Sequence, residues 1–197
     1  MLGRNAVKIA VQPNEVGLSN LDQTHNLTLN YVYELPFFRH ETGLAASVFG
    51  NWEVSGIAVF SSGFPFTSTI TGDRAGVGGG TQRPNVVGTP TRFGSVNLFF
   101  DTTAFALAPL GQFGNEGNGV IRGPGISDDF TVNFYRNFKF HAWGKEGQKL
   151  RIGAEFFNIF NHANFSAVGA VVGAATFGHV TAALDPREIQ FSARLSF

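Results

Sequence analysis

The sequence predicts an all-β fold, an antiparallel up-and-down meander of about five long strands. Five stretches alternate apolar and polar residues with the period of two that a strand imposes. The chain contains 22 Phe and 25 Gly, and only 14% of its residues are charged, against roughly 25% in soluble domains. No apolar run approaches the ~18 residues of a membrane helix. An aromatic-rich, charge-poor chain of this kind is typical of β-structure and fits a membrane environment.

The alternation is clearest in residues 187–197. Ile189, Phe191, Leu195 and Phe197 are apolar, and polar residues stand between them. A soluble sheet seldom leaves a flat edge strand so apolar, because such an edge invites aggregation. A transmembrane β-barrel turns its apolar side chains to lipid and its polar ones to the lumen. This stretch therefore predicts a membrane-crossing strand.

Four other stretches have the same pattern. The predicted strands cover, in chain order, about residues 25–35, 51–61 with a possible extension to 70, 129–141, 148–160 and 187–197. Arg136 interrupts the apolar face of the third, and we expect it near a strand end or with its charge reaching an interface. Residues 71–127 and 161–186 are predicted to be long extracellular loops, since barrels of this type have long loops outside and short turns in the periplasm.

These strands predict part of a large transmembrane β-barrel. Five strands cannot close one, because even small barrels use eight, so we expect an open curved sheet. The first residues do not form a signal peptide, and residues 1–197 are therefore expected to be the C-terminal part of a longer protein. Trp52, Phe138 and Phe140 are predicted to lie at the membrane interface, and the expected localisation is the outer membrane of a Gram-negative-type envelope.

Composition argues against two classes of function. The formal net charge is zero, which gives no electrostatic reason to expect a nucleic-acid partner. Cysteine is absent, so thiolate metal sites and disulfides are excluded.

Two groups of polar residues invite a ligand-binding interpretation. Asp22, His25, His40 and Glu41 have metal-binding side chains, but their spacing matches no recognised site. Gly76–Gly80 lies close to Arg74, as in a phosphate loop. The Gly-Lys-Ser/Thr sequence and a following helix are absent, so a flexible loop is the better interpretation. We predict no metal and no cofactor.

Two further groups invite a catalytic interpretation. Glu53 and Glu155 resemble a glycosidase pair, although that chemistry requires a fixed separation and lumen-facing charge explains both. His141, His162 and Ser166 supply two members of a hydrolase triad without a nucleophile elbow. We predict no catalytic residues and no enzyme; hydrolysis abolished by changing Ser166 or His162 would reverse this.

An ordered series of motifs resembles the barrel of TonB-dependent outer-membrane receptors, specifically the Oar-like branch. The series covers residues 20–197, and its members, in chain order, are Asp22–His25, Tyr31–Pro36, Trp52–Ile57, Ser62–Phe66, Arg83–Asn85, Phe100–Phe105, Phe113–Asn115, Arg122–Gly125, Arg151, Glu155–His162, Asn164–Phe165, Asp185–Arg187 and Phe197.

The resemblance implies a barrel of about 22 strands around an N-terminal plug, and energised import of a large or scarce solute through TonB. Plug, TonB-contacting segment and most strands are missing from this sequence, so transport by this chain alone is not expected. The implied partners are outer-membrane lipid, the barrel assembly machinery, TonB through the missing N-terminal part, and an unknown solute. The terminal Phe, which the assembly machinery recognises in that family, corresponds to Phe197.

A second function hypothesis remains open. The Phe-rich faces also suit the inside of a soluble β-sandwich, which would present its Gly-rich loops to a ligand. The two hypotheses differ in what covers the apolar faces, lipid or protein.

Overall fold

The computed structural model describes residues 17–37, 43, 48–142 and 145–197. The chain divides into two compact units. The sheet unit consists of residues 24–62, 125–165 and 183–197, and the loop unit consists of residues 1–23, 63–124 and 166–182. Within the described residues, no helix has the length and apolar character needed to cross a bilayer.

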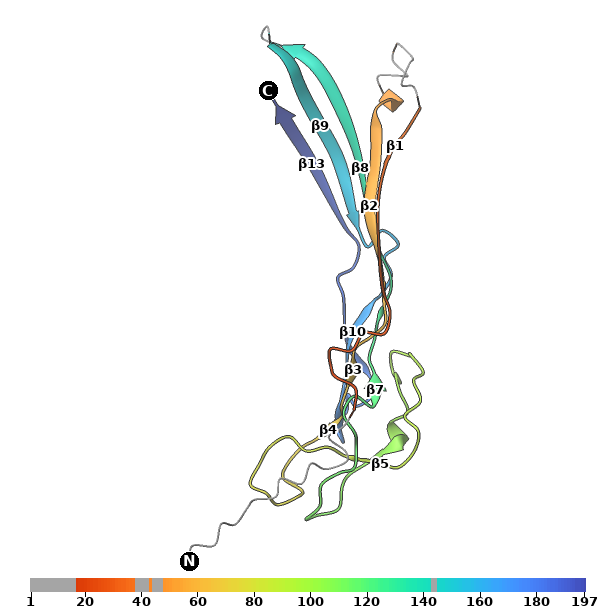
Figure 1. The fold of residues 1–197 in the computed structure, drawn as a ribbon, viewed down its shortest axis with the longest axis vertical. Coiled ribbons are helices and arrows are strands. Elements are labelled where there is room, and N and C mark those ends of the chain that lie inside the picture. Colours follow the sequence, from red (N-terminus) through yellow and green to blue (C-terminus); the bar gives the residue numbers. More distant parts are fainter. Residues whose placement is uncertain (1–16, 38–42, 44–47, 143–144) are drawn as a thin grey trace, which may run out of the picture. The chain divides into compact units, whose positions relative to one another are not determined.

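The sheet unit is a single five-stranded sheet (Figure 1). Its spatial order is β1 (Asn26–Glu34), β2 (Trp52–Ser61), β8 (Ile126–Ala142), β9 (Lys145–Phe157) and β13 (Glu188–Ser196). All four pairings are antiparallel. The predicted fold class, an open antiparallel meander of five long strands, is confirmed.

The register gathers the apolar residues of all five strands on one face, because directly paired residues of antiparallel strands point to the same side. The row Leu29, Ala58 and Phe130 is one example. A second row joins Phe134, Ala154 and Phe191. The opposite face carries the polar residues and Tyr135, together with the apolar residues Val32, Ile57, Val59 and Phe157. The five alternations predicted separately therefore combine into one two-faced sheet.

Many side chains of this apolar face stay exposed, although Ala58 on the central part of the sheet is buried and Phe134 is half-buried. Leu27 retains 51% of its accessible surface, Phe191 81% and Ile152 37%. A β-sandwich would bury such residues against a second layer. The exposure is what an outward, lipid-facing surface requires.

Several strand ends differ from the expectation. β8 and β9 each begin three residues earlier than predicted, at Ile126 and Lys145. β9 stops at Phe157 because Asn158 adopts a positive φ of 48°, which bends the backbone out of the extended region. The extension of the second strand to residue 70 is wrong, because β2 ends at Ser61. Residues beyond Gly63 belong to the loop unit instead.

The loop unit is built from short strand pairs and a 3₁₀ turn over Thr102–Ala104. The pairs are β3 (Pro65–Phe66) with β7 (Ile121–Arg122), β5 (Asn85–Val86) with β6 (Phe105–Ala106), β4 (Thr69–Ile70) with β11 (Val171–Val172), and β10 (Phe165–Val168) with β12 (Val180–Ala183). The two long connections predicted from the sequence contact each other, because the Phe99 N–H donates to the Gly178 carbonyl at 2.7 Å and the Val180 N–H donates to the Val96 carbonyl at 2.8 Å.

A phenylalanine cluster forms the core of the loop unit. Phe100 is fully buried and meets Phe105 and Phe177 edge-to-face, with ring centroids 5.7 and 5.3 Å apart. Phe99 and Ile121 complete the buried cluster. Some of the Phe residues therefore form a buried hydrophobic core like that of a soluble domain. The sequence analysis had placed the Phe residues on lipid-facing strands.

Candidate functional site

The polar face of the sheet carries a connected set of side chains from four strands. Arg151 on β9 donates to Glu53 on β2 at 2.9 Å, and its guanidinium lies over the ring of Tyr135 on β8 at 3.8 Å. The Tyr135 hydroxyl donates to Glu155 at 2.6 Å. Ser192 on β13 also reaches Glu155, at 3.4 Å. The predicted carboxylate pair is thus engaged in structural contacts that cross the sheet.

Tyr135 also covers the backbone of Gly153, its register partner on β9. A side chain at Gly153 would collide with the Tyr135 ring. An aromatic ring laid over a strand glycine shields the backbone that the glycine leaves bare. The ring orientation therefore depends on this glycine.

Arg136 interrupts the apolar face of β8, and only 7% of its surface is exposed. Its guanidinium donates to the carbonyl of Val48 at 2.7 Å and stacks on Phe138 at 4.2 Å. Trp52, its register partner, donates to the same carbonyl at 3.1 Å. Arg136 lies level with the first residue of β2 but well inside its own strand β8, which continues to Ala142, so the expected position near the end of its strand is not found.

An asparagine junction, defined by Asn158 and Asn164, ties three strands together at one end of the sheet. Asn164 accepts from the Ser127 backbone N–H at 3.2 Å and donates to the Asp128 carbonyl at 2.9 Å, both on β8. Asn158 accepts from the His162 N–H and donates to the carbonyl of Asp185, just before β13. Both amides are buried. The junction closes the turn after β9 and positions the start of β13.

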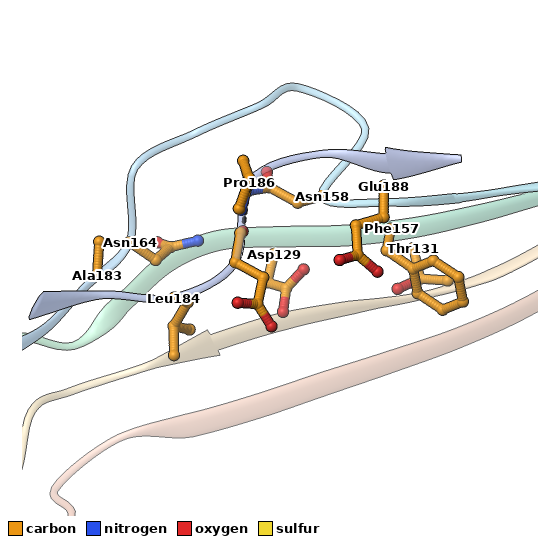
Figure 2. Close-up of a pocket in the computed structure, with 10 residues that line it drawn as sticks. Asp129, Thr131, Phe157, Asn158, Asn164, Ala183, Leu184, Pro186 and Glu188 are labelled. Carbon is orange, nitrogen blue, oxygen red and sulfur yellow. Dashed lines mark hydrogen bonds between the residues drawn. The ribbon is translucent and has the colours of Figure 1, made fainter. Parts of the chain in front are cut away.

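A cavity of about 420 Å³ opens beside this junction (Figure 2). Asp129, Asp185 and Glu188 are its ionisable lining residues, and Phe157 and Leu184 supply apolar surface. Asp185, Glu188 and Leu184 are exposed, so the cavity is a shallow surface hollow with an acidic lining.

His162 contacts Ser127 and Asp128, a set of residue types that resembles a catalytic triad. The Ser127 Oγ lies 3.0 Å from Nε2, and the Asp128 Oδ1 lies 3.2 Å from Nδ1. Yet the same Oγ is also 3.2 Å from Oδ1. Partners aligned with the two ring nitrogens stand on opposite sides of an imidazole, as in working triads. Here the Ser127 and Asp128 oxygens lie next to each other on the same edge of the imidazole ring, so the cluster is not arranged for proton relay. Ser166, the serine of the triad interpretation that the sequence did not favour, lies on β10 and is absent from these contacts.

The glycine-rich loop does form an anion nest, but its own carboxylate fills it. The Asp73 side chain accepts from the backbone N–H groups of Gly76, Val77 and Gly78. The N–H groups of Gly78 and Val77 hold the pKa of Asp73 below its usual value. Because the donors that a phosphate would need are occupied, the loop is a hydrogen-bonded turn and not a phosphate site. The expected flexibility of the loop stays a prediction.

Glu116 is a buried acid in the loop unit that the sequence gave no reason to single out. It is fully buried; Oε1 accepts from the Ser68 N–H at 2.9 Å, and Oε2 has no hydrogen-bond partner within the described residues. Burial raises its pKa to about 7. Glu116 is therefore poised to carry a proton near neutral pH.

The remaining sequence candidates separate in the structure. Asp22 pairs with Arg122 at 2.7 Å. His40 and Glu41 lie outside the described residues, as do the side chains of His141 and Phe140. Across the described chain, no group of three or more His, Cys, Asp or Glu residues is arranged to hold a metal. Phe197 follows β13 and is 91% exposed.

Several motifs of the series contact one another. Asn115 donates its backbone N–H to the Asn85 side chain at 3.0 Å, and the Asn115 side chain accepts from the Val86 N–H at 2.7 Å. Gly63 meets Gly123 so closely that a side chain at Gly63 would strike the Gly123 carbonyl. Sequence reasoning recognised these motifs, but their pairing required coordinates. The sequence also offered a sign of the asparagine junction, because Asn residues such as Asn158 and Asn164 often hydrogen-bond to the backbone in turns.

Comparison with known proteins agrees with this geometry. A family model described as an outer membrane beta barrel domain matches residues 3–190. No curated protein and no solved structure matches the chain. The family match spans almost the whole length, and the sheet has the apolar exterior and polar interior that such a barrel requires. The chain therefore belongs to the outer membrane β-barrel domain family and is a protein of the outer membrane.

Proposed function

We propose that this chain forms part of the barrel wall of a TonB-dependent transporter of the Oar-like branch, which imports a large or scarce solute. The observation that carries the proposal is the contact between motifs that resemble that branch: Asn85 with Asn115, Gly63 with Gly123, and the asparagine junction. Motifs that meet in space support each other as parts of one architecture.

The polar face supports the same proposal. Its Glu53, Arg151 and Tyr135 side chains hold one another in place, as the inner wall of a large polar lumen requires. The packed loop unit gives the long connections a fixed shape, which suits the recognition of a solute. We assign no catalytic role, and binding and passage are the proposed activities.

The proposed partners follow from this role. Outer-membrane lipid covers the apolar face, and the barrel assembly machinery recognises Phe197. TonB acts through a plug-bearing part of the transporter outside residues 1–197, and no nucleic acid takes part.

Uptake in the native host tests the proposal. We expect deletion of the gene to reduce accumulation of at least one radiolabelled solute too large for passive pores, from a panel of ferric chelates, cobalamins, oligosaccharides and peptides. A protonophore should lower wild-type uptake to the deletion level, because TonB transmits inner-membrane energy. Uptake of a small pore-permeant sugar is the control. Unchanged accumulation across the panel, or a loss that ignores the protonophore, would contradict energised import.

A further inference from the structure

The strand register places four cationic residues together on the polar face of β8, β9 and β13, which lie side by side (Figure 1). Lys139 on β8 is the direct partner of Lys149 on β9. Arg151 on β9 is the direct partner of Arg194 on β13. Lys149 and Arg151 are two residues apart on one strand, so they point to the same side of the sheet. We call these four residues the basic patch.

The basic patch concentrates like charges. Directly opposite residues of antiparallel strands have Cα atoms about 4.5–5.5 Å apart, and the next residue on the same face of a strand lies about 7 Å away. Like charges that stand directly opposite one another destabilise a sheet. The patch contains two such pairs in adjacent rows, so the fold bears an electrostatic cost that neutral polar residues would avoid.

Most of this positive charge has no counter-charge. Arg151 pairs with Glu53 at 2.9 Å, and its Nε atom has no hydrogen-bond partner within the described residues. The other three side chains of the patch, Lys139, Lys149 and Arg194, are exposed. No ion pair joins any of these three to a carboxylate in the part of the chain that the structure describes. Three cations therefore stay free to meet an anion from outside the sheet.

The basic patch lies toward one end of the polar face. β8 ends at Ala142 and β9 begins at Lys145, so the connection between them is a short turn. Outer-membrane barrels have short turns on the periplasmic side and long loops outside. The patch is on the side of this short turn, whereas Asp129 and Glu188 lie near the opposite ends of β8 and β13. Positive charge is thus concentrated at the periplasmic end of the lumen wall.

We propose that the basic patch binds a soluble polyanion, a molecule that carries two or more phosphate or carboxylate groups. Arginine offers such groups a fork of N–H donors, and lysine offers a compact charge. The free cations are on the polar face, which a soluble molecule reaches from the lumen. A bound anion also offsets the repulsion within the two like-charged pairs. The inference rests on the register and on membership of the barrel family, and it holds whether or not the barrel imports a solute by energised transport.

Binding of tripolyphosphate and of citrate to the protein purified from native outer membranes in a non-ionic detergent tests the proposal. Isothermal titration calorimetry at low ionic strength measures each Kd, and the two probes distinguish phosphate from carboxylate ligands. The test variant combines Lys149→Gln with Arg194→Gln, which removes one member of each like-charged pair. Arg187→Gln, an exposed arginine just before β13, is the matched control. Lys139→Gln replaces the test variant should that one fail to fold.

We expect at least one of the two anions to bind the wild type saturably and to raise its unfolding temperature, because a ligand of the folded state stabilises it. The double variant should bind that anion roughly tenfold more weakly, as the loss of two exposed ion pairs implies. The control should stay within about twofold of the wild type, because screening limits the reach of a distant charge. Without ligand, the double variant should unfold at the same temperature as the wild type or higher, since it loses like-charge repulsion.

Three results would overturn the proposal. The first is the absence of saturable binding of either anion to the wild type, as when an acidic polypeptide segment already covers the patch. The second is equal weakening by the double variant and the control, because binding would then follow net charge alone. The third is a lower unfolding temperature of the ligand-free double variant with unchanged anion affinity, which would make the cations structural.

Discussion

At the scale of single residues, the buried carboxyl of Glu116 predicts a pH-dependent stability. Desolvation raises its pKa in the folded protein to about 7 from 4.5, so the folded state holds a proton that the unfolded state releases. The stability is fully present below the unfolded pKa and is lost as pH rises through the folded one. The loop unit should lose roughly 3 kcal/mol between pH 4 and pH 8, at 1.36 kcal/mol per pKa unit.

Hydrogen exchange of the peptide containing Ser68, corrected for intrinsic rates, measures this loss. Glu116→Gln should abolish the pH dependence, because the amide keeps the neutral form of the side chain. Glu188→Gln, an exposed carboxyl on β13, is the matched control and should leave the wild-type profile intact. A wild-type profile that is flat over this range would refute the buried-acid interpretation.

Asp73 predicts the opposite dependence on pH. Hydrogen bonds from Gly78 and Val77 lower its pKa, so its contribution is present above the ordinary carboxyl pKa and disappears as pH falls through the folded value. Asp73→Asn should accelerate amide exchange at Gly76–Gly78, because an amide group cannot accept at both positions. Asp129→Asn serves as the control. Exchange as slow as in the wild type would show that the nest does not hold the loop.

Neither residue was predictable from the sequence, and for a physical reason. The burial of Glu116 depends on Ser68 and Arg83, which are far away in the chain, and no local pattern encodes that contact. Asp73 stands three residues before Gly76, which predicted only a flexible turn. The backbone N–H groups of this loop come within hydrogen-bonding distance of the Asp73 carboxylate only when the loop is folded.

At the scale of elements, alternation specified the strands because the lipid-facing and lumen-facing sides impose a strict period. The sequence predicted the apolar face of β13 and the interruption by Arg136 in β8. It did not predict the loop unit, whose strands β3–β7 are two residues long. Pairs this short have no detectable period, and their stability comes from the Phe100 cluster and from contacts between motifs.

The asparagine junction predicts that Asn164 ties the turn after β9 to the start of β8. Asn164→Ala would remove the partners of the Ser127 N–H and the Asp128 carbonyl, which are only partly buried, at a cost of about 1–2 kcal/mol. Urea unfolding in detergent micelles measures the loss. Gln190→Ala, on the exposed polar face of β13, should change stability by less than about 0.5 kcal/mol. Equal losses of stability from the two substitutions would show that the Asn164 hydrogen bonds do not stabilise the sheet.

At the scale of the whole molecule, the membrane-barrel interpretation requires that lipid covers the apolar face of the sheet. Phe191→Arg places a charge on that face and should cost up to about 2–4 kcal/mol in lipid, with less near an interface. Ser192→Arg, one residue on, projects to the polar face near Glu155 and should be almost neutral. Folding into lipid vesicles, followed by protease resistance, compares them. Equal tolerance of both arginines would argue that lipid does not cover the apolar face.

Phe197 separates assembly in the cell from intrinsic stability. It lies beyond β13 and is almost fully exposed, so it contributes little packing, and its proposed role is recognition by the assembly machinery. Phe197→Ala should leave folding into vesicles unchanged and reduce the amount of protein in native outer membranes several-fold. Phe191→Ala, an exposed aromatic within β13, is the control for loss of apolar surface alone; it should change the two readouts together. If Phe197→Ala lowered vesicle folding and membrane level in equal measure, Phe197 would be a structural residue and the recognition role would fall.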